Sequence, residues 1–368
     1  MEATDDLPSG TFAERLLQVI DEGQRTATYK LALLLALIDA TAEGADAAGR
    51  PPAVLGTRTI ADHVVRLYFP QVRLYLAGDG SEHALRQITV KESVAIRSVL
   101  RLEMTAKDAG CRTIDQAKRA LPEAVERCLD GVELNFVRYP ILRLQNVGRS
   151  SRPFIYDIDW TEAITLKRLR ARGVDHLRFR PGAADHLLRL APLIRPLVEV
   201  HWTRMVGQLN GLHLEEESLR HHLFGVERLA FPSRLRHGVI DLQDGNCFYC
   251  GSRLGSRSEI DHFLPWVRYP NNAIENLVAA DRCNGNKRHH LVTLEHVGHW
   301  ADRLRARSAD LESIADESGW LTEPVRSLAL IRSGYAHLPA GTPLWNAIDE
   351  FVEEPISPIS QRLSEVGA

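Results

Sequence analysis

Long apolar runs are missing from this sequence. The densest one, residues 31–38, is far shorter than the roughly 18 to 20 residues that cross a bilayer, and it lies inside a segment that predicts a core helix. The first ten residues, MEATDDLPSG, are acidic and polar, which is the wrong chemistry for a secretory signal. These two absences predict a soluble, cytoplasmic protein.

Lysine is also scarce, so nearly all of the positive charge is arginine. It occurs only at Lys30, Lys91, Lys107, Lys118, Lys167 and Lys287. Arginine binds phosphates and base edges bidentately, although a GC-rich genome would produce the same bias without any function. The formal net charge of −3 gives no global attraction to nucleic acid.

Cysteine is present in an odd number, five. Cys111 and Cys128 stand alone in helical-looking sequence, where small buried hydrophobic side chains are expected. Cys247, Cys250 and Cys283 instead cluster at metal-ligand spacing. A metal site in a reducing compartment explains this pattern better than disulfides do.

The chain of 368 residues, 44% hydrophobic and 25% charged, is long enough for two domains with sizeable cores. Its patterns predict an α+β fold that is mainly helical, with a small sheet in a helical N-terminal domain. We expect domains at 1–165 and 233–335, a helical connector at 166–232, and a C-terminal helix and tail at 336–368.

Helical periodicity and cap residues predict most of the secondary structure. Helices are expected at 11–24, 28–42, 59–68, 89–109, 113–121, 122–130, 183–209, 233–243, 293–315 and 341–352. The alternating, β-branched segment 132–160 predicts a hairpin. The polar, proline-containing tail after residue 352 is typical of disorder.

The segment CFYCGSRLGSRSEIDHFLPWVRYPNNAIENLVAADRCNGNKRHHL, residues 247–291, carries the densest chemistry. Thiolates bind Zn²⁺ tetrahedrally, and Cys-x2-Cys followed by Cys283 has the spacing of such a site. Between these cysteines, residues 251–266 predict a hairpin whose second strand, 258–263, carries Asp261 and His262. Neighbouring strand residues face opposite sides, which is unusual for two such polar side chains.

The order of CFYCG, DHFLPW, ENLV and CNGNK resembles the HNH, or ββα-metal, endonucleases of restriction and defence systems. The resemblance covers only this part of the chain. It implies that 233–335 is a ββα-metal nuclease module with flanking helices, which hydrolyses DNA phosphodiester bonds.

This resemblance also implies a role for each matching residue. His262 would be the general base for water. Asp261 and Asn284 would offer oxygen ligands to a catalytic Mg²⁺ or Mn²⁺. Asn276 would fix the loop that presents the base, Lys287 would contact phosphate, and the cysteines would hold a structural Zn²⁺.

One position departs from the family pattern. Ala280 stands where many relatives have a fourth zinc ligand, so Asp281, a nearby histidine such as His289 or His290, or a water would complete the site, or zinc would bind weakly. Asn284 has an alternative role as a helix N-cap.

The N-terminal half carries a shorter likeness. TYKLALLLALIDA at 28–40 and RYPILRLQNVG at 138–148 resemble the sulfur-binding domains of phosphorothioate-dependent restriction enzymes. This implies an apolar pocket for the DNA sulfur at Tyr139 and Pro140, on a strand, and phosphate contacts from Arg138 or Arg143. The alternative, which we favour, is that Tyr139 and Pro140 are packing and strand-edge residues.

Basic contacts to DNA are further expected from GRSSR at 148–152, which contains Arg149 and Arg152, and from KRLRAR at 167–172. Residues 1–165 are therefore expected to recognise DNA, with or without a modification, or to act as a sensor.

The function that these patterns favour is a metal-dependent DNA endonuclease in restriction or anti-phage defence. A double-strand cut usually needs two active sites, so a homodimer is expected. Two alternatives stay open: a toxin or abortive-infection nuclease that a partner or ligand releases, and a zinc-stabilised DNA-binding protein that has lost cleavage.

Overall fold

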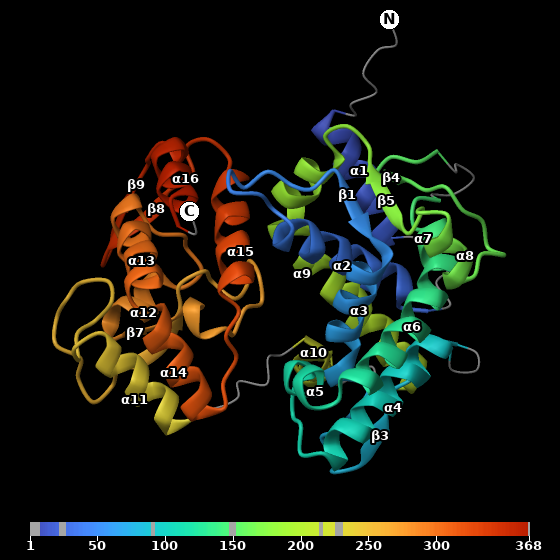
Figure 1. The fold of residues 1–368 in the computed structure, drawn as a ribbon, viewed down its shortest axis with the longest axis horizontal. Coiled ribbons are helices and arrows are strands. Elements are labelled where there is room, and N and C mark those ends of the chain that lie inside the picture. The colour runs from blue at the N-terminus through green and yellow to red at the C-terminus, as the bar shows by residue number, and fades with distance from the viewer. Residues whose placement is uncertain are drawn as a thin grey trace, which may run out of the picture. The chain divides into compact units, whose positions relative to one another are not determined.

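The computed structural model describes residues 8–21, 27–89, 93–146, 152–212, 216–224 and 231–366. The chain divides into two compact units, and Figure 1 labels most of their elements. Unit 1 comprises residues 1–41 and 53–227, and unit 2 comprises residues 42–52 and 228–368. Residues 166–227, which were expected to form a connector, are thus part of unit 1.

Unit 1 is a helical assembly with two small antiparallel sheets. Its helices are α1 (Ser9–Asp21), α2 (Tyr29–Glu43), α3 (Thr57–Gln71), α4 (Val94–Asp108), α5 (Ile114–Ala120), α6 (Pro122–Arg138), α7 (Pro140–Arg143), α8 (Leu166–Ala171), α9 (Ala183–Asn210) and α10 (Glu216–Phe224). Strands β1 (Val54–Gly56), β5 (His176–Phe179) and β4 (Tyr156–Asp157) form one sheet in that order, and β2 (Leu74–Leu76) pairs with β3 (Glu82–Ala84).

Helix α2 lies at the centre of the core of unit 1. Each residue from Leu31 to Ile38 is at most 1% exposed, because a helix that is apolar all round can only be stable when it is surrounded by protein. The prediction of a core helix is therefore confirmed, as is a fold that is α+β and mainly helical.

The hairpin predicted for 132–160 is wrong. Helix α6 continues to Arg138, and α7 follows at once. The buried residues Val125, Leu129, Val132 and Phe136 recur every three or four positions, which is the spacing of one helix face. That longer pattern outweighs the local β-branched alternation, and among the described residues of this segment only Tyr156–Asp157 forms a strand.

Unit 2 builds a strand–strand–helix element into a helical frame. Its elements are α11 (Ser233–Leu242), β6 (Glu259–His262), the 3₁₀ turn η1 (Ile274–Asn276), β7 (Leu277–Ala280), α12 (Arg282–Lys287), α13 (Leu294–Ala306), α14 (Ser308–Ser318), α15 (Pro324–Ala336), β8 (Leu344–Ala347), β9 (Glu350–Val352) and α16 (Ile356–Ser364). Strands β6 and β7 pair antiparallel, with His262 opposite Leu277.

Several predictions in the C-terminal half are corrected. Residues 341–352 form the hairpin β8–β9 around Asp349, which has a φ of 60°, a turn conformation that Asp tolerates. The tail is ordered as α16 because Ile359 and Leu363 are buried. The long helix at 293–315 is two helices, and β6 pairs with β7 rather than with a preceding strand.

Two helix ends also differ from prediction. Helix α3 continues through Pro70 to Gln71, whereas the proline was expected to stop it. Helix α1 begins at Ser9 and is described as far as Asp21. No helix among the described residues is long and apolar enough to cross a membrane.

Candidate functional site

The three clustered cysteines meet in unit 2. Cys247 and Cys250 lie in the turn after α11, and Cys283 is in the first turn of α12. Their sulfur atoms all lie within 4.8 Å of one another, and sulfurs around a tetrahedral Zn²⁺ are about 3.8 Å apart. The group could therefore hold a metal ion after a small contraction.

A fourth protein ligand does not join this group. Among the described residues, the cluster contains no further His, Cys, Asp or Glu, so the suggestion that Asp281, His289 or His290 completes it finds no support here. Ser252 is the polar neighbour, with its Oγ 3.0 Å from Cys250 Sγ.

The thiols of this cluster differ in acidity. Burial raises the pKa of Cys250, but hydrogen bonds from the side chain and backbone of Ser252 and from the other thiols outweigh it, and the pKa falls to about 7. Burial and the neighbouring Cys247 raise the pKa of Cys283. In the metal-free protein, Cys250 thus ionises more readily than Cys283.

Asp261 of β6 is hydrogen-bonded to the side chains of Tyr249 and Lys287. Its Oδ2 accepts a hydrogen bond from Tyr249 Oη at 2.6 Å and one from Lys287 Nζ at 2.9 Å. Lys287 also donates to the carbonyl oxygen of His262 at 2.8 Å. Burial lowers the pKa of Lys287, and Asp261 opposes this effect.

This geometry corrects the role expected for Lys287. Its side chain is 0% exposed, so it is a buried partner of Asp261 and not a surface contact for phosphate. Burial, and then the charge of Asp261, raise the pKa of Tyr249 well above its usual value, so Tyr249 stays a donor to this carboxylate.

Asn284 lies on the same side of β6 as Asp261. Its Nδ2 donates to Glu259 Oε2 at 2.6 Å, and Glu259 precedes Asp261 by two positions on β6, so both carboxylates share one strand face. The N-cap of α12 is Asp281, which excludes the alternative that Asn284 caps this helix.

Glu259 is the residue that sequence reasoning missed. The signal was available, because carboxylates at positions i and i+2 of a strand project to one side. The contact of Glu259 with Asn284 could not be predicted from the sequence, because it depends on the packing of α12 against β6. Glu259, Asp261 and Asn284 together present oxygen donors, the ligands that hard cations prefer.

His262 lies at the end of β6, half-buried, with Nε2 2.8 Å from Asn272 Oδ1. A carboxamide oxygen only accepts, so this contact suits the tautomer that carries its proton on Nε2. The rings of Trp266 and Phe231 lie 5.4 and 6.1 Å from the imidazole. The histidine is thus oriented by an amide and flanked by aromatic rings.

Asn276 is fully buried and holds the loop between β6 and β7. Its Oδ1 accepts from Leu264 N at 2.7 Å, and its Nδ2 donates to the carbonyl oxygens of Leu264 and Asn271 at 3.1 and 3.0 Å. These contacts are those of a positioning residue, because a side chain with no exposed surface cannot touch a substrate.

The structure places the residues expected to read DNA in unit 1 at a helix junction. Tyr139 and Pro140 join α6 to α7 instead of lying on a strand. Tyr139 is 50% exposed, with the guanidinium of Arg143 5.6 Å from its ring centre, and Pro140 is buried.

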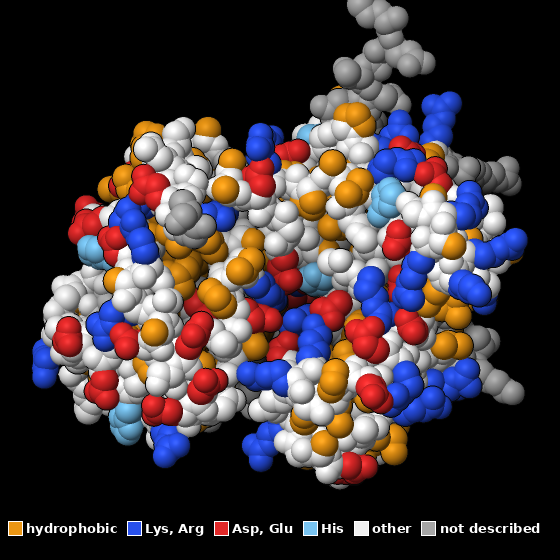
Figure 2. Space-filling model, in the orientation of Figure 1, with side chains coloured by type: hydrophobic (Ala, Val, Ile, Leu, Met, Phe, Trp, Pro, Cys, Tyr) orange, Lys and Arg blue, Asp and Glu red, His pale blue; other side chains and the backbone are white. Residues whose placement is uncertain are grey.

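Two arginines near this junction have hydrogen-bond or ion-pair partners within unit 1. Arg138 Nε donates to the Ile164 carbonyl oxygen at 3.0 Å, and Arg143 pairs with Glu162. Arg152 accepts at its backbone oxygen from Arg15, and Arg149 lies outside the described residues. On the face that Figure 2 shows, basic and acidic side chains are interspersed in each unit.

The comparisons with known proteins concern unit 1. A family model described as a domain of unknown function, DUF8808, matches residues 9–223, which is more than half of the chain. The chain belongs to the DUF8808 family. The matched region runs from α1 into α10 and contains none of the metal-site residues described above. No curated protein and no solved structure matches the chain.

Proposed function

We propose that unit 2 of this DUF8808 protein is a metal-dependent endonuclease of the HNH type that hydrolyses DNA. One observation carries the proposal. Asn284 of α12 meets Glu259 of β6 on the strand face that also bears Asp261, and His262 follows directly. Phosphodiester hydrolysis requires a cation and a general base, and the neighbouring residues Asp261 and His262 of β6 offer one each.

The oxygen donors of this site suit Mg²⁺ or Mn²⁺. Asp261 and Asn284, with Glu259 as a third group, would hold the ion, with water and phosphate completing its coordination. When bound, such an ion neutralises charge on the scissile phosphate and on the leaving oxygen. Lys287 and Tyr249 orient the Asp261 carboxylate by binding its Oδ2, which leaves Oδ1 for the cation.

His262 supplies the base. With the proton on Nε2, directed to Asn272, Nδ1 takes the proton from the attacking water. Asn276 holds the backbone at Leu264, two residues after His262, so the imidazole has a rigid support. Cys247, Cys250 and Cys283 would bind a structural Zn²⁺ that ties the turn after α11 to the start of α12.

We further propose that unit 1 directs the nuclease to DNA in a restriction or anti-phage role, and that two chains combine for a double-strand cut. The support is the sequence likeness together with the physical need of a small nuclease module for a recognition unit. The position of Tyr139 at a helix junction, half-exposed and not on a strand, weakens the case for a sulfur pocket there.

The test uses supercoiled plasmid, unmodified or phosphorothioated, with Mg²⁺ or Mn²⁺. We expect metal-dependent nicking or linearisation by the natural protein, loss of that activity in His262→Ala, and full activity in the control His289→Ala, whose side chain is exposed nearby on the chain. A preference between plasmids would show modification-dependent targeting. DNA binding without cleavage under any metal would contradict the proposal and favour an inactive or gated protein.

A further inference from the structure

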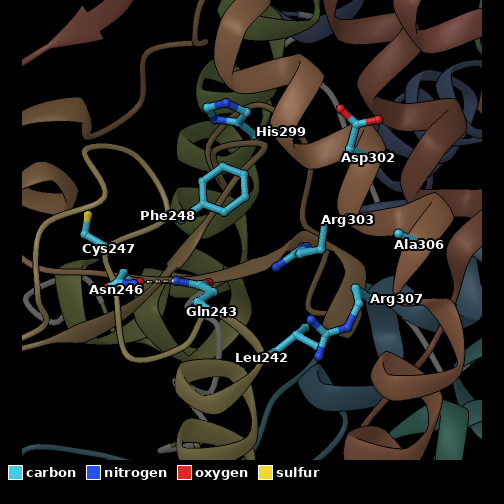
Figure 3. Close-up of a pocket in the computed structure, with 10 residues that line it drawn as sticks. All are labelled: Leu242, Gln243, Asn246, Cys247, Phe248, His299, Asp302, Arg303, Ala306 and Arg307. Carbon is cyan, nitrogen blue, oxygen red and sulfur yellow. Dashed lines mark hydrogen bonds between the residues drawn. The ribbon is translucent and has the colours of Figure 1, made fainter.

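A pocket of about 390 Å³ opens on unit 2 beside the cysteine cluster. Figure 3 shows its lining, which comes from the end of α11, the turn after it and α13. Ligand sites in proteins commonly have volumes of roughly 300 to 1,000 Å³. The pocket is therefore larger than an inorganic ion requires and has room for a small organic molecule.

Arg303 gives this pocket a positive charge that no direct ion pair among the described residues offsets, although the charge of the buried Glu275 acts on it. In Figure 3 the side chain of Arg303 extends from α13 toward Phe248 and Gln243. Its Nη1 and Nη2 donate to the carbonyl oxygens of Leu277 and Glu275 at 2.8 and 2.6 Å. Its buried Nε has no hydrogen-bond partner, and within the described ranges no carboxylate forms an ion pair with it.

A buried guanidinium with an unsatisfied N–H is a strong candidate to receive an anion. Buried polar groups are nearly always hydrogen-bonded, and an exception calls for an explanation. Burial lowers the pKa of Arg303 to about 10, so the group is still charged at neutral pH. Among possible acceptors, an anionic group forms the strongest hydrogen bond with a guanidinium.

The remaining charges of the pocket are mostly compensated. Asp302 pairs with Arg305 at 3.0 Å and with Arg362 at 2.5 Å. Arg307 pairs with Asp310 on the surface, where such pairs are weak, so its guanidinium can turn to a ligand. Net attraction in the pocket is thus for negative charge.

The other walls suit a flat ring. The Phe248 ring is half-buried, with the guanidinium of Arg303 5.5 Å from its centre, and Leu242 and Ala306 add apolar surface. Gln243 and Asn246 bring amide groups to the same wall (Figure 3). An anionic group at Arg303 and a ring against Phe248 can be parts of one molecule.

We propose that this pocket binds a small phosphorylated ligand with an aromatic ring, of the mononucleotide class. The phosphate would bind Arg303 and Arg307, and the ring would lie against Phe248. Free nucleotide and the terminal nucleotide of a DNA strand share this chemistry, and the pocket is assigned to the free molecule because its lining is local to the end of α11, the turn after it and α13.

Arg303 connects the pocket to the loop behind His262. The two carbonyl oxygens that it binds, of Glu275 and Leu277, flank Asn276, which in turn holds Leu264. A ligand that draws Arg303 toward it would weaken the hydrogen bonds of Arg303 to this loop and so change the rate of cleavage. This consequence rests on the proposed nuclease function. Binding is measured separately, so the two proposals can fail independently.

The test is calorimetric titration of the full chain with AMP, and with adenosine, inorganic phosphate and a short DNA duplex as separate arms. Ala306→Glu places a carboxylate at the exposed rim of the pocket, and Ala306→Gln is its neutral match. We expect AMP to bind at least about tenfold more tightly than adenosine or phosphate. Ala306→Glu should weaken AMP binding by about tenfold or more, and Ala306→Gln by less than about threefold.

A third variant, Phe248→Leu, should weaken AMP and adenosine but not inorganic phosphate. The proposal is overturned if AMP does not bind at millimolar concentration, or if both substitutions at Ala306 have the same effect, which would place the ligand elsewhere. Equal affinities for phosphate and AMP would remove the aromatic part of the assignment. Duplex binding that Ala306→Glu weakens, in the absence of AMP binding, would instead assign the pocket to DNA. Unchanged unfolding midpoints of the ligand-free variants are the control for folding.

Discussion

Lys287 Nζ lies 2.9 Å from Asp261 Oδ2 and 2.8 Å from the carbonyl oxygen of His262. One buried ammonium thus joins the end of α12 to the two neighbouring residues on which the proposed chemistry depends. A buried charge is tolerated when it is paired and hydrogen-bonded. This contact is therefore both a clamp on the fold and the reason why the Asp261 carboxylate has a fixed orientation.

Removing this clamp should be costly. Lys287→Met leaves the Asp261 carboxylate buried without its cation, and breaking a buried pair in this way costs about 3 to 5 kcal/mol. We expect a loss of that size in the free energy of unfolding, measured with urea. Arg288→Met, at the exposed neighbouring position, is the control and should change little. A loss below about 1 kcal/mol for Lys287→Met would show that the pair is solvated.

The carboxylate that the sequence did not reveal, Glu259, should tune the cation site. Glu259→Gln removes a charge from the strand face shared with Asp261, and changes next to a metal ligand typically lower affinity by about 10- to 100-fold. We expect the Mn²⁺ concentration that gives half-maximal cleavage to rise by about tenfold, with the maximal rate less affected. Glu295→Gln, an exposed change on α13, is the control. If the metal dependence is unchanged, Glu259 does not bind the cation and only accepts the hydrogen bond from Asn284.

The metal-free cysteine cluster should show pH-dependent reactivity. The pKa of Cys250 is about 7, and the thiolate is the nucleophile. Its alkylation by iodoacetamide should therefore rise about tenfold per unit of pH below 7 and level off above it. Peptide mapping by mass spectrometry gives the rate at each cysteine.

Two comparisons make that experiment decisive. Burial raises the pKa of Cys128 to about 12, so this thiol should not react over the same range. Added Zn²⁺ should protect Cys250, because coordination occupies the sulfur. Alkylation of Cys250 that is indifferent to zinc would argue against a metal site at the three cysteines.

The loop behind His262 should depend on Asn276. Asn276→Ala deletes the bonds to Leu264 and Asn271, and leaving buried backbone groups unsatisfied costs about 1 to 3 kcal/mol. We expect that loss in stability together with a fall in the cleavage rate but not in DNA affinity. Gln145→Ala is a matched control in unit 1, because Gln145 also bonds several buried backbone groups. If both variants lose activity equally, the effect is one of general stability.

Much of this architecture could be predicted because it is local. The all-apolar segment 31–38 can only be stable when it is surrounded by protein, so it predicted a core helix without knowledge of its neighbours. Residues 247–283 contain the thiols and the strand–strand–helix order within a short stretch of chain. The spacing of Cys247, Cys250 and Cys283 was therefore enough to predict that their sulfur atoms lie close together. Asn276 likewise fixes the loop that its position predicted.

Only the tertiary structure decided the rest, because it depends on partners distant in sequence. Lys287 is buried because Asp261 and Tyr249 converge on it, and Glu259 joins the site because α12 folds over β6. Residues 132–138 remain helical because the face that begins at Val125 continues through them. Local patterns thus determined which elements and ligands form, whereas packing determined which charges are buried, which are paired, and which can meet a ligand.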